Sequence, residues 1–145
     1  MKAKEIDHIC FAVRNLEQAR AQYEGLFGLE PDGFYEAPSE SIRVARYYLG
    51  TVALELMEPM NDECEVARFL DKKGEGVFLI SYRVDDVEAG LKELKDKGLR
   101  TIDQEPRKLL GYRYAFIAPP SHTCGVLTEI IDGEFDYSYD NPTKG

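Results

Sequence analysis

Short stretches rich in apolar, aromatic and β-branched residues recur along the chain, and this pattern is typical of β-strands. They cover residues 6–13, 42–49, 52–57, 77–84, 112–118 and 126–131. The first and the fourth stretch are each followed by a segment that carries the capping residues of an α-helix. Asn15 and Asp86 suit the N-cap, and Gly28 and Gly98 suit the left-handed C-terminal cap. The pattern therefore predicts two helices, each preceded by a strand.

The second half of the chain repeats the first half. The strand and cap at residues 77–86 correspond to residues 6–15, 71 positions earlier. Glu129 corresponds to Glu55 with a spacing of 74, and the extra residues fit in the Pro- and Ser-containing turn at 119–124. Each copy is expected to consist of a strand, a helix and three strands. A further short helix is expected near residues 65–72.

One copy alone would leave a face of its sheet uncovered, so we expect the two copies to pack together. The predicted fold class is α+β, with two tandem βαβββ modules that form a curved, partly open mixed sheet around a cleft. Within one domain of residues 1–145, module one spans about 5–58, the linker 59–75, module two about 76–132 and the tail 133–145. Two alternatives stay open for the tail: it is disordered, or it covers a partner in a dimer.

Composition narrows the possible functions. A chain of 145 residues with 43% hydrophobic and 31% charged residues is typical of one globular domain. The net charge of −9 repels polyanions and argues against a nucleic-acid partner. The apolar stretches are too short to span a membrane and no signal peptide is recognised, so we expect a cytoplasmic protein without a membrane partner. Cys10, Cys64 and Cys124 are widely spaced and odd in number, which predicts reduced thiols.

Several short motifs lie in the same order as in a known protein family. They are Ile6-Asp7-His8-Ile9, Leu26-Phe27-Gly28-Leu29, Leu54-Glu55-Leu56-Met57-Glu58-Pro59, Phe69-Leu70 with Gly74-Glu75-Gly76, Arg83-Val84-Asp85-Asp86, Asp103-Gln104-Glu105-Pro106 and Gly125-Val126-Leu127-Thr128-Glu129. On these motifs, which cover residues 6–131, the chain resembles the vicinal oxygen chelate superfamily of glyoxalases and bleomycin-resistance proteins. Within that superfamily it is most similar to the methylmalonyl-CoA epimerases.

The resemblance implies a divalent cation, held by a histidine on the first strand, a histidine on the fifth strand and side chains of the paired late strands. Carried over to this chain, the ligands are His8, Glu55 and Glu129. The fifth-strand position holds Leu79, with Phe78 beside it, and a hydrocarbon side chain cannot coordinate a metal. The ligand set is therefore incomplete: it suits Mg²⁺ or Mn²⁺ with waters, and affinity for Co²⁺ or Zn²⁺ is expected to fall.

Glu55 and Glu129 are the candidate catalytic residues, because two carboxylates on either side of a substrate can remove and return a proton. Burial among apolar neighbours would raise their pKa and suit this role. The alternative is that both lie on the solvent-facing side of a two-faced strand. For His8, the alternative to a ligand or proton carrier is a hydrogen-bonded core histidine.

The candidate substrate-binding residues are mostly apolar or aromatic. They are Tyr47, Phe78, Leu79, Leu110, Tyr112, Arg113 and Phe116, and several of them lie in or near the segment 107–113, which we expect to be a loop. Core packing is the more common role of Leu and Phe. The basic residues Arg43, Arg46, Arg107, Lys108 and Arg113 are candidates for contacts with CoA phosphates, and the alternative is ordinary surface charge.

Two function classes follow from these observations. The first is an isomerase similar to the methylmalonyl-CoA epimerases, which transfers a proton at the carbon alpha to a thioester or related carbonyl. The second is a metal-free member of the superfamily that binds an apolar or aromatic small molecule. A purely structural domain would leave the paired carboxylates unexplained. We expect a small-molecule substrate, of which a CoA thioester is the candidate, and a homodimer.

Overall fold

The computed structural model describes residues 1–138, and the end of the predicted tail, 139–145, lies outside the described residues. The chain divides into two compact units. From here on, module one means the unit His8–Phe78, and module two means the unit that combines Met1–Asp7 with the chain from Leu79 onward. None of the helices within residues 1–138 has the length and apolar character needed to cross a membrane.

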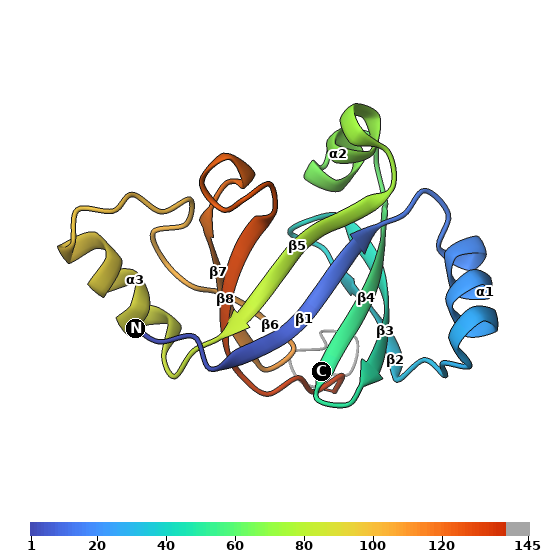
Figure 1. Ribbon diagram of the computed structural model, residues 1–145, viewed down its shortest axis with the longest axis horizontal. Helices are drawn as coiled ribbons and strands as arrows, with labels where there is room; N and C mark the ends of the chain where they lie inside the picture. Colours follow the sequence, from blue (N-terminus) through green and yellow to red (C-terminus); the bar gives the residue numbers. More distant parts are fainter. Residues whose placement is uncertain (139–145) are drawn as a thin grey trace. The chain divides into compact units, whose positions relative to one another are not determined.

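Module one is a mixed four-stranded sheet with two helices (Figure 1). Its elements are β1 (Glu5–Ala12, of which the part from His8 belongs here), α1 (Leu16–Phe27), β2 (Gly33–Ala37), β3 (Ile42–Leu49), β4 (Val52–Pro59) and α2 (Glu65–Lys73). The strand order is β2-β3-β4-β1. β1 runs parallel to β4, whereas β2, β3 and β4 pair in antiparallel fashion. This arrangement agrees with the strand, helix and three strands expected from the sequence, and α2 confirms the short helix expected near residues 65–72.

Local sequence explains where α1 begins and ends. The Asn15 side chain accepts a hydrogen bond from the Gln18 amide, and Gly28 closes the helix in the left-handed conformation with φ 63°. Both predicted caps are confirmed. The buried side of α1 packs on one face of the sheet, which we call the α1 face. The buried residues of this cluster are Val13, Leu16, Ala19, Ala45, Tyr47 and Leu56.

Module two repeats the same plan. Its elements are β5 (Gly76–Arg83, from Leu79 onward in this module), α3 (Val87–Asp96), β6 (Arg107–Leu109), β7 (Tyr112–Ala118), the short 3₁₀ helix η1 (Pro120–His122) and β8 (Leu127–Gly133). The strand order is β5-β8-β7-β6, with β5 parallel to β8. The Asp86 side chain caps α3 through the Ala89 amide, as predicted. Val84, Val87, Leu91, Ala115 and Ile130 form the core beneath α3, on what we call the α3 face.

The second strand of each module is the part of the fold that the sequence did not locate. β2 and β6 are short, and the segment 107–113, expected to be a loop, is instead the β6–β7 hairpin. Leu110 and Gly111 form its two-residue turn with φ values of 49° and 88°. Positive φ at both turn positions is the geometry that matches the twist of paired strands, but leucine there is uncommon, which explains why the turn was not recognised.

A carboxylate at the end of the last strand anchors the helix in each module. In module one, Glu58 accepts a hydrogen bond from the first amide of α1 at 2.6 Å and pairs with Arg43 at 2.9 Å. In module two, Asp132 accepts from the Val87 amide at 2.7 Å and pairs with Arg113 at 2.7 Å. A negative charge at a helix N-terminus is favourable because the unpaired amides and the helix dipole face it. We refer to these two groups as the helix anchors.

Candidate functional site

Strand alternation and register gather polar side chains on the face of the module-one sheet opposite α1, which we call the Glu55 face. His8 and Cys10 lie two positions apart on β1, and Cys10 is the register partner of Glu55 on β4. Arg46 on β3 is the register partner of Glu55 on the other side. Because side chains of paired positions share a face, the sheet itself brings these groups together.

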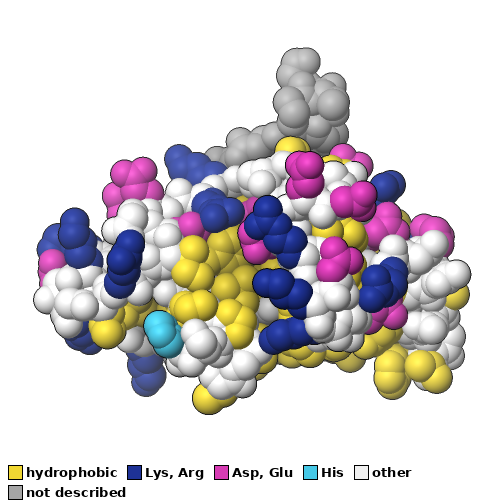
Figure 2. All heavy atoms as spheres, turned by 90° about the horizontal axis from the view of Figure 1, so that it is seen from above, with side chains coloured by type: hydrophobic (Ala, Val, Ile, Leu, Met, Phe, Trp, Pro, Cys, Tyr) yellow, Lys and Arg dark blue, Asp and Glu magenta, His cyan; other side chains and the backbone are white. Residues whose placement is uncertain are grey.

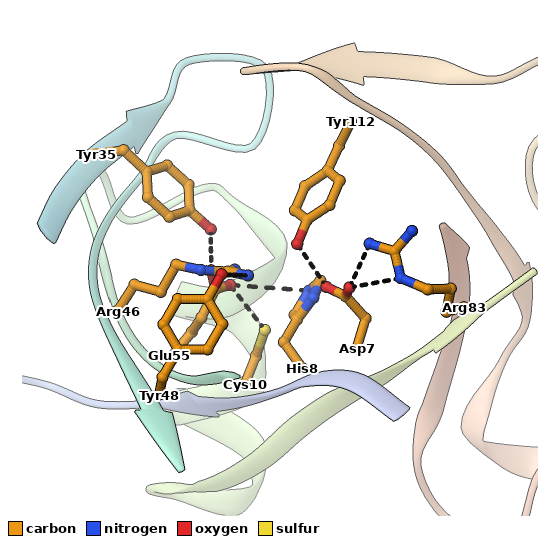
Figure 3. Close-up of polar contacts among 9 residues, drawn as sticks. All are labelled: Asp7, His8, Cys10, Tyr35, Arg46, Tyr48, Glu55, Arg83 and Tyr112. Carbon is orange, nitrogen blue, oxygen red and sulfur yellow. Dashed lines mark hydrogen bonds and ion pairs between the residues drawn. The ribbon is translucent and has the colours of Figure 1, made fainter. Parts of the chain in front are cut away.

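The two oxygens of the Glu55 carboxylate have different surroundings (Figure 3). Oε2 accepts hydrogen bonds from Arg46 Nη1 at 2.7 Å and from the Tyr35 hydroxyl at 2.7 Å. Oε1 accepts from Cys10 Sγ at 3.3 Å and lies 3.8 Å from His8 Nε2. Glu55 and Arg46 are each only 1% exposed, so neither the carboxylate nor the guanidinium is on a solvent-facing side of the strand.

The same contacts determine the protonation state of Glu55. Burial by itself would raise the pKa of this carboxyl group, as the sequence led us to expect. The nearby His8 and Arg46, together with the hydrogen bonds from Tyr35 and Arg46, outweigh burial and hold the pKa below its usual value. The expectation of a raised pKa at Glu55 is therefore wrong, because it did not include a buried arginine partner. Glu55 is ionised at neutral pH and is better suited to bind a cation than to store a proton.

His8, Cys10 and Glu55 together form a possible metal-binding group. One donor atom from each of the three buried residues lies within 4.8 Å of the others. Imidazole nitrogen, thiol sulfur and carboxylate oxygen are all ligand types of borderline divalent metals, so this donor set fits a cation. The sequence predicted His8 and Glu55 as ligands; Cys10 was read only as a reduced thiol.

In module two, Glu129 lies on the face opposite α3, which we call the Glu129 face. Its register partners are Ser81 on β5 and Phe116 on β7, and Leu79 lies two positions before Ser81 on the same face. Glu129 is 3% exposed, which excludes a solvent-facing position for this carboxylate as well. The Ser81 hydroxyl is fully buried and has no hydrogen-bond partner among residues 1–138.

A second polar cluster of module two surrounds Asp7. Arg83 Nη2 donates to Asp7 Oδ1 at 2.7 Å, and the Tyr112 hydroxyl donates to Asp7 Oδ2 at 2.7 Å (Figure 3). Arg83 also donates to the Gly133 carbonyl at 2.8 Å. These contacts give Tyr112, one of the predicted substrate-binding residues, a structural partner, and they fasten Asp7 to β5 and β7.

Two other predicted substrate-binding residues, Tyr47 and Arg113, are bound to side chains of the protein itself. Tyr47 lies on the α1 face, not on the Glu55 face, and its hydroxyl donates to Glu24 at 2.8 Å. Arg113 belongs to the module-two helix anchor, and Arg43, a candidate for phosphate contacts, belongs to the module-one anchor. We therefore do not assign Tyr47 or Arg113 to a substrate.

The remaining predicted pocket residues lie in different parts of the two modules. The Phe78 ring packs edge-on against Phe69 with centroids 5.3 Å apart. Leu79 is buried opposite Leu127, and Leu110 occupies the hairpin turn. The guanidinium of Arg107 lies over the half-buried Phe116 ring at 4.7 Å.

Three residues around Glu55 were not predicted in this role. Arg46 was a candidate for phosphate contacts, Cys10 was predicted only as a reduced thiol, and Tyr35 was not singled out. The β3 stretch places Val44, Arg46 and Tyr48 on one face, so an arginine at the centre of that face was a signal of a buried charge partner.

Acidic and basic side chains are interspersed over the surface drawn in Figure 2, and the net charge of −9 is not concentrated in one acidic area of that view.

Comparisons with known proteins agree with this fold. A family model described as the Glyoxalase/Bleomycin resistance protein/Dioxygenase superfamily matches residues 7–116. YqjC of Bacillus subtilis is 35% identical over 132 residues, covering 90% of this chain and 94% of YqjC. The ethylmalonyl-CoA/methylmalonyl-CoA epimerase of Cereibacter sphaeroides is 32% identical over 127 residues, covering 86% of this chain and 95% of that protein.

The solved structures similar to this chain include a variant of Streptomyces coelicolor methylmalonyl-CoA epimerase in complex with 2-nitronate-propionyl-CoA. It superposes with a TM-score of 0.84 at 30% identity, covering 97% of this chain and all of the other. These two similar proteins carry the names of ethylmalonyl-CoA/methylmalonyl-CoA and methylmalonyl-CoA epimerases, which favours an epimerase-like isomerase over a metal-free binding protein.

Proposed function

This chain belongs to the glyoxalase/bleomycin resistance protein/dioxygenase superfamily, and on that premise we propose that it epimerises an acyl-CoA thioester by moving the proton on the carbon alpha to the thioester carbonyl. The observation that supports the proposal most strongly is the buried Glu55 carboxylate, with one oxygen tied to Arg46 and Tyr35 and the other facing His8 and Cys10. A stability requirement alone does not favour burying so many polar groups, because their desolvation is costly.

The reaction needs a base, an acid and a group that stabilises the intermediate. A base removes the α-proton, the electron pair passes into the thioester to give an enolate, and an acid returns a proton on the opposite side. Stabilising the enolate oxygen commonly contributes several kcal/mol, about the size of the oxyanion-hole effects seen in other enzymes. A divalent cation, when bound, supplies this stabilisation as a Lewis acid.

We assign the two carboxylates different roles. Glu55 is ionised and ion-paired, so we assign it, with His8, to holding the cation. Glu129 is buried between Leu127 and Ile131 on its strand, and we assign it to proton transfer. Arg46 offsets the charge of Glu55 and orients its carboxylate through a hydrogen bond to Oε2. The Arg46 guanidinium is itself held by a hydrogen bond that it donates to the Tyr48 hydroxyl. The earlier expectation that both carboxylates transfer protons stays a prediction.

The test is proton exchange in deuterated water. The purified protein is mixed with (2R)- or (2S)-methylmalonyl-CoA, with and without Mg²⁺ or Co²⁺, and loss of the α-proton signal is followed by NMR. We expect exchange that depends on the cation and a loss of at least a hundredfold in Glu129→Gln, the lower end of a general-base contribution. Glu105→Gln, on an exposed segment, is the matched control.

Each variant then discriminates between the roles. Loss of exchange in Glu55→Gln that excess cation restores fits Glu55 as a ligand. Loss of exchange from only one stereoisomer in Glu55→Gln would instead make Glu55 a proton-transfer group. No exchange from either stereoisomer with any cation would overturn the proposal for this substrate. The homodimer and the cytoplasmic location stay predictions.

A further inference from the structure

We propose that Cys10 is itself a metal ligand, so that His8, Cys10 and Glu55 hold the cation through a nitrogen, a sulfur and an oxygen. The inference deepens the proposed function, because it concerns the cation that the proposed reaction uses. Sulfur in this set changes which metal the protein prefers.

The backbone places Cys10 for this role. His8 and Cys10 are two positions apart on β1 and therefore point to the same face, and Cys10 is directly in register with Glu55 on the parallel strand β4. All three side chains are buried and belong to module one. Rigid strands hold ligands more accurately than loops do.

The distances are close to those of a tetrahedral metal site. Zinc bonds of about 2.0–2.3 Å to nitrogen, oxygen and sulfur, combined with the tetrahedral angle, put ligand atoms about 3.4–3.6 Å apart. Cys10 Sγ lies 3.3 Å from Glu55 Oε1, and His8 Nε2 lies 3.8 Å from the same oxygen. The histidine nitrogen and the cysteine sulfur lie within 4.8 Å of one another, so a small side-chain rotation closes the triangle.

The charges of the site also accommodate a cation. The Cys10 thiol now donates to Glu55 Oε1; on binding it would release its proton to solvent and become a thiolate. Thiolate and carboxylate together neutralise a divalent charge. Arg46, 2.7 Å from the other oxygen of Glu55, then keeps that carboxylate oriented with Oε1 toward the metal.

A thiolate ligand selects the metal class. Cysteine sulfur favours Zn²⁺ and Co²⁺ and disfavours Mg²⁺, which prefers oxygen ligands. The loss of a histidine at Leu79 suggested weak binding of Zn²⁺ and Co²⁺, and Cys10 reverses that expectation. The competing interpretation is that Cys10 is an ordinary small core residue with a weak hydrogen bond.

Cobalt absorption separates the two interpretations. Metal-free protein, kept reduced, is titrated with Co²⁺, and the near-ultraviolet thiolate-to-cobalt charge-transfer band is recorded. We expect the band in the wild type and in Cys124→Ser, whose cysteine is exposed, and its loss in Cys10→Ser together with at least tenfold weaker binding. Cys10→His, which replaces sulfur with nitrogen, should bind Co²⁺ without the band. Circular dichroism melts of the metal-free variants confirm that they fold, and Cys10→Ala replaces Cys10→Ser if the serine variant does not.

The outcomes keep this inference separate from the proposed function. A cobalt complex without the band in the wild type, an unchanged band in Cys10→Ser, or no bound cobalt would overturn the role of Cys10, whatever the exchange assay shows. A band that disappears in Cys10→Ser together with no exchange of methylmalonyl-CoA would support the ligand role and reject the proposed substrate.

Discussion

Glu55 in module one and Glu129 in module two occupy equivalent register positions, but their neighbours differ. Glu55 lies between Cys10 and Arg46, whereas Glu129 lies between Ser81 and Phe116. The helix anchors are the same in both modules, with an Arg–carboxylate pair holding the first amide of the helix. The repeated backbone thus keeps its anchors and varies the chemistry of the opposite face.

The difference in neighbours underlies the two roles that we propose for this carboxylate position. With an arginine beside it, the carboxylate is held ionised and suits cation binding. Glu129 has Phe116 where Glu55 has Arg46, and this difference is why we propose proton transfer for Glu129. The following substitutions test this division, beginning with the largest expected effect.

Removal of Arg46 should have the largest effect on stability. Arg46→Met leaves Glu55 charged and buried, and breaking a buried ion pair from one side costs about 3–5 kcal/mol. Arg83→Met in module two is the matched control; its side chain is 26% exposed, so we expect a loss of about 1–2 kcal/mol. Urea unfolding measures both free energies. Adding Glu55→Leu to Arg46→Met should restore most of the loss, and equal costs for Arg46→Met and Arg83→Met would contradict the comparison.

Leu79→His tests the position of module two that corresponds to His8. Without metal, a buried imidazole that replaces leucine is expected to cost about 1–3 kcal/mol. Thermal unfolding of the metal-free protein measures this cost. A matched Ile80→His variant, at a half-buried position of the same strand, should lose less stability, and equal losses would contradict the prediction.

Ser81→Ala should stabilise the metal-free protein slightly, by about 1 kcal/mol. The buried Ser81 hydroxyl has no partner among the described residues, and removing such a group also removes its desolvation penalty. The midpoint of urea unfolding reports the change. A destabilisation of more than about 1 kcal/mol would mean that the hydroxyl makes a favourable interaction in solution.

Tyr47→Phe is expected to have the smallest effect on the free energy of unfolding, and this effect is confined to alkaline pH. Burial and the hydrogen bond to Glu24 raise the pKa of this phenol from 10.0 to about 12. Stability from the neutral phenol is therefore present below pH 10 and is lost as the pH rises toward about 12. Tyr47→Phe should flatten this part of the pH dependence of unfolding, with Tyr82→Phe as control. In module two, Ile117 packs against the core beneath α3, and an isoleucine side chain does not titrate.

The sequence predicted those parts of the fold that depend on local signals. The caps at Asn15, Gly28 and Asp86 are confirmed, because a cap is formed by residues adjacent in the chain. β2, β6 and the β6–β7 turn were not located, because the short strands carry a weak pattern and the turn contains a leucine with positive φ, whereas β7 was predicted.

The candidate site was predicted only in part, for a physical reason. His8 and Glu55 were identified through the repeat and the family resemblance, and in the structure His8 Nε2 lies 3.8 Å from Glu55 Oε1. The partnership of Arg46 with Glu55 depends on strand register, which composition does not specify. Without that partner the direction of the Glu55 pKa shift could not be obtained, because burial and ion pairing act in opposite directions.

The β6–β7 turn has a practical consequence for engineering this protein. The Asp136 amide donates to the Leu110 carbonyl, and a Cβ on Gly111 would collide with the carbonyl oxygen of Glu134. An epitope tag or fluorescent label inserted between these turn residues would therefore push away the segment that follows β8. Ser121 and His122 are exposed in the short helix η1, where the His122 amide donates to the Pro119 carbonyl, so a label attached to either side chain is expected to leave the protein folded.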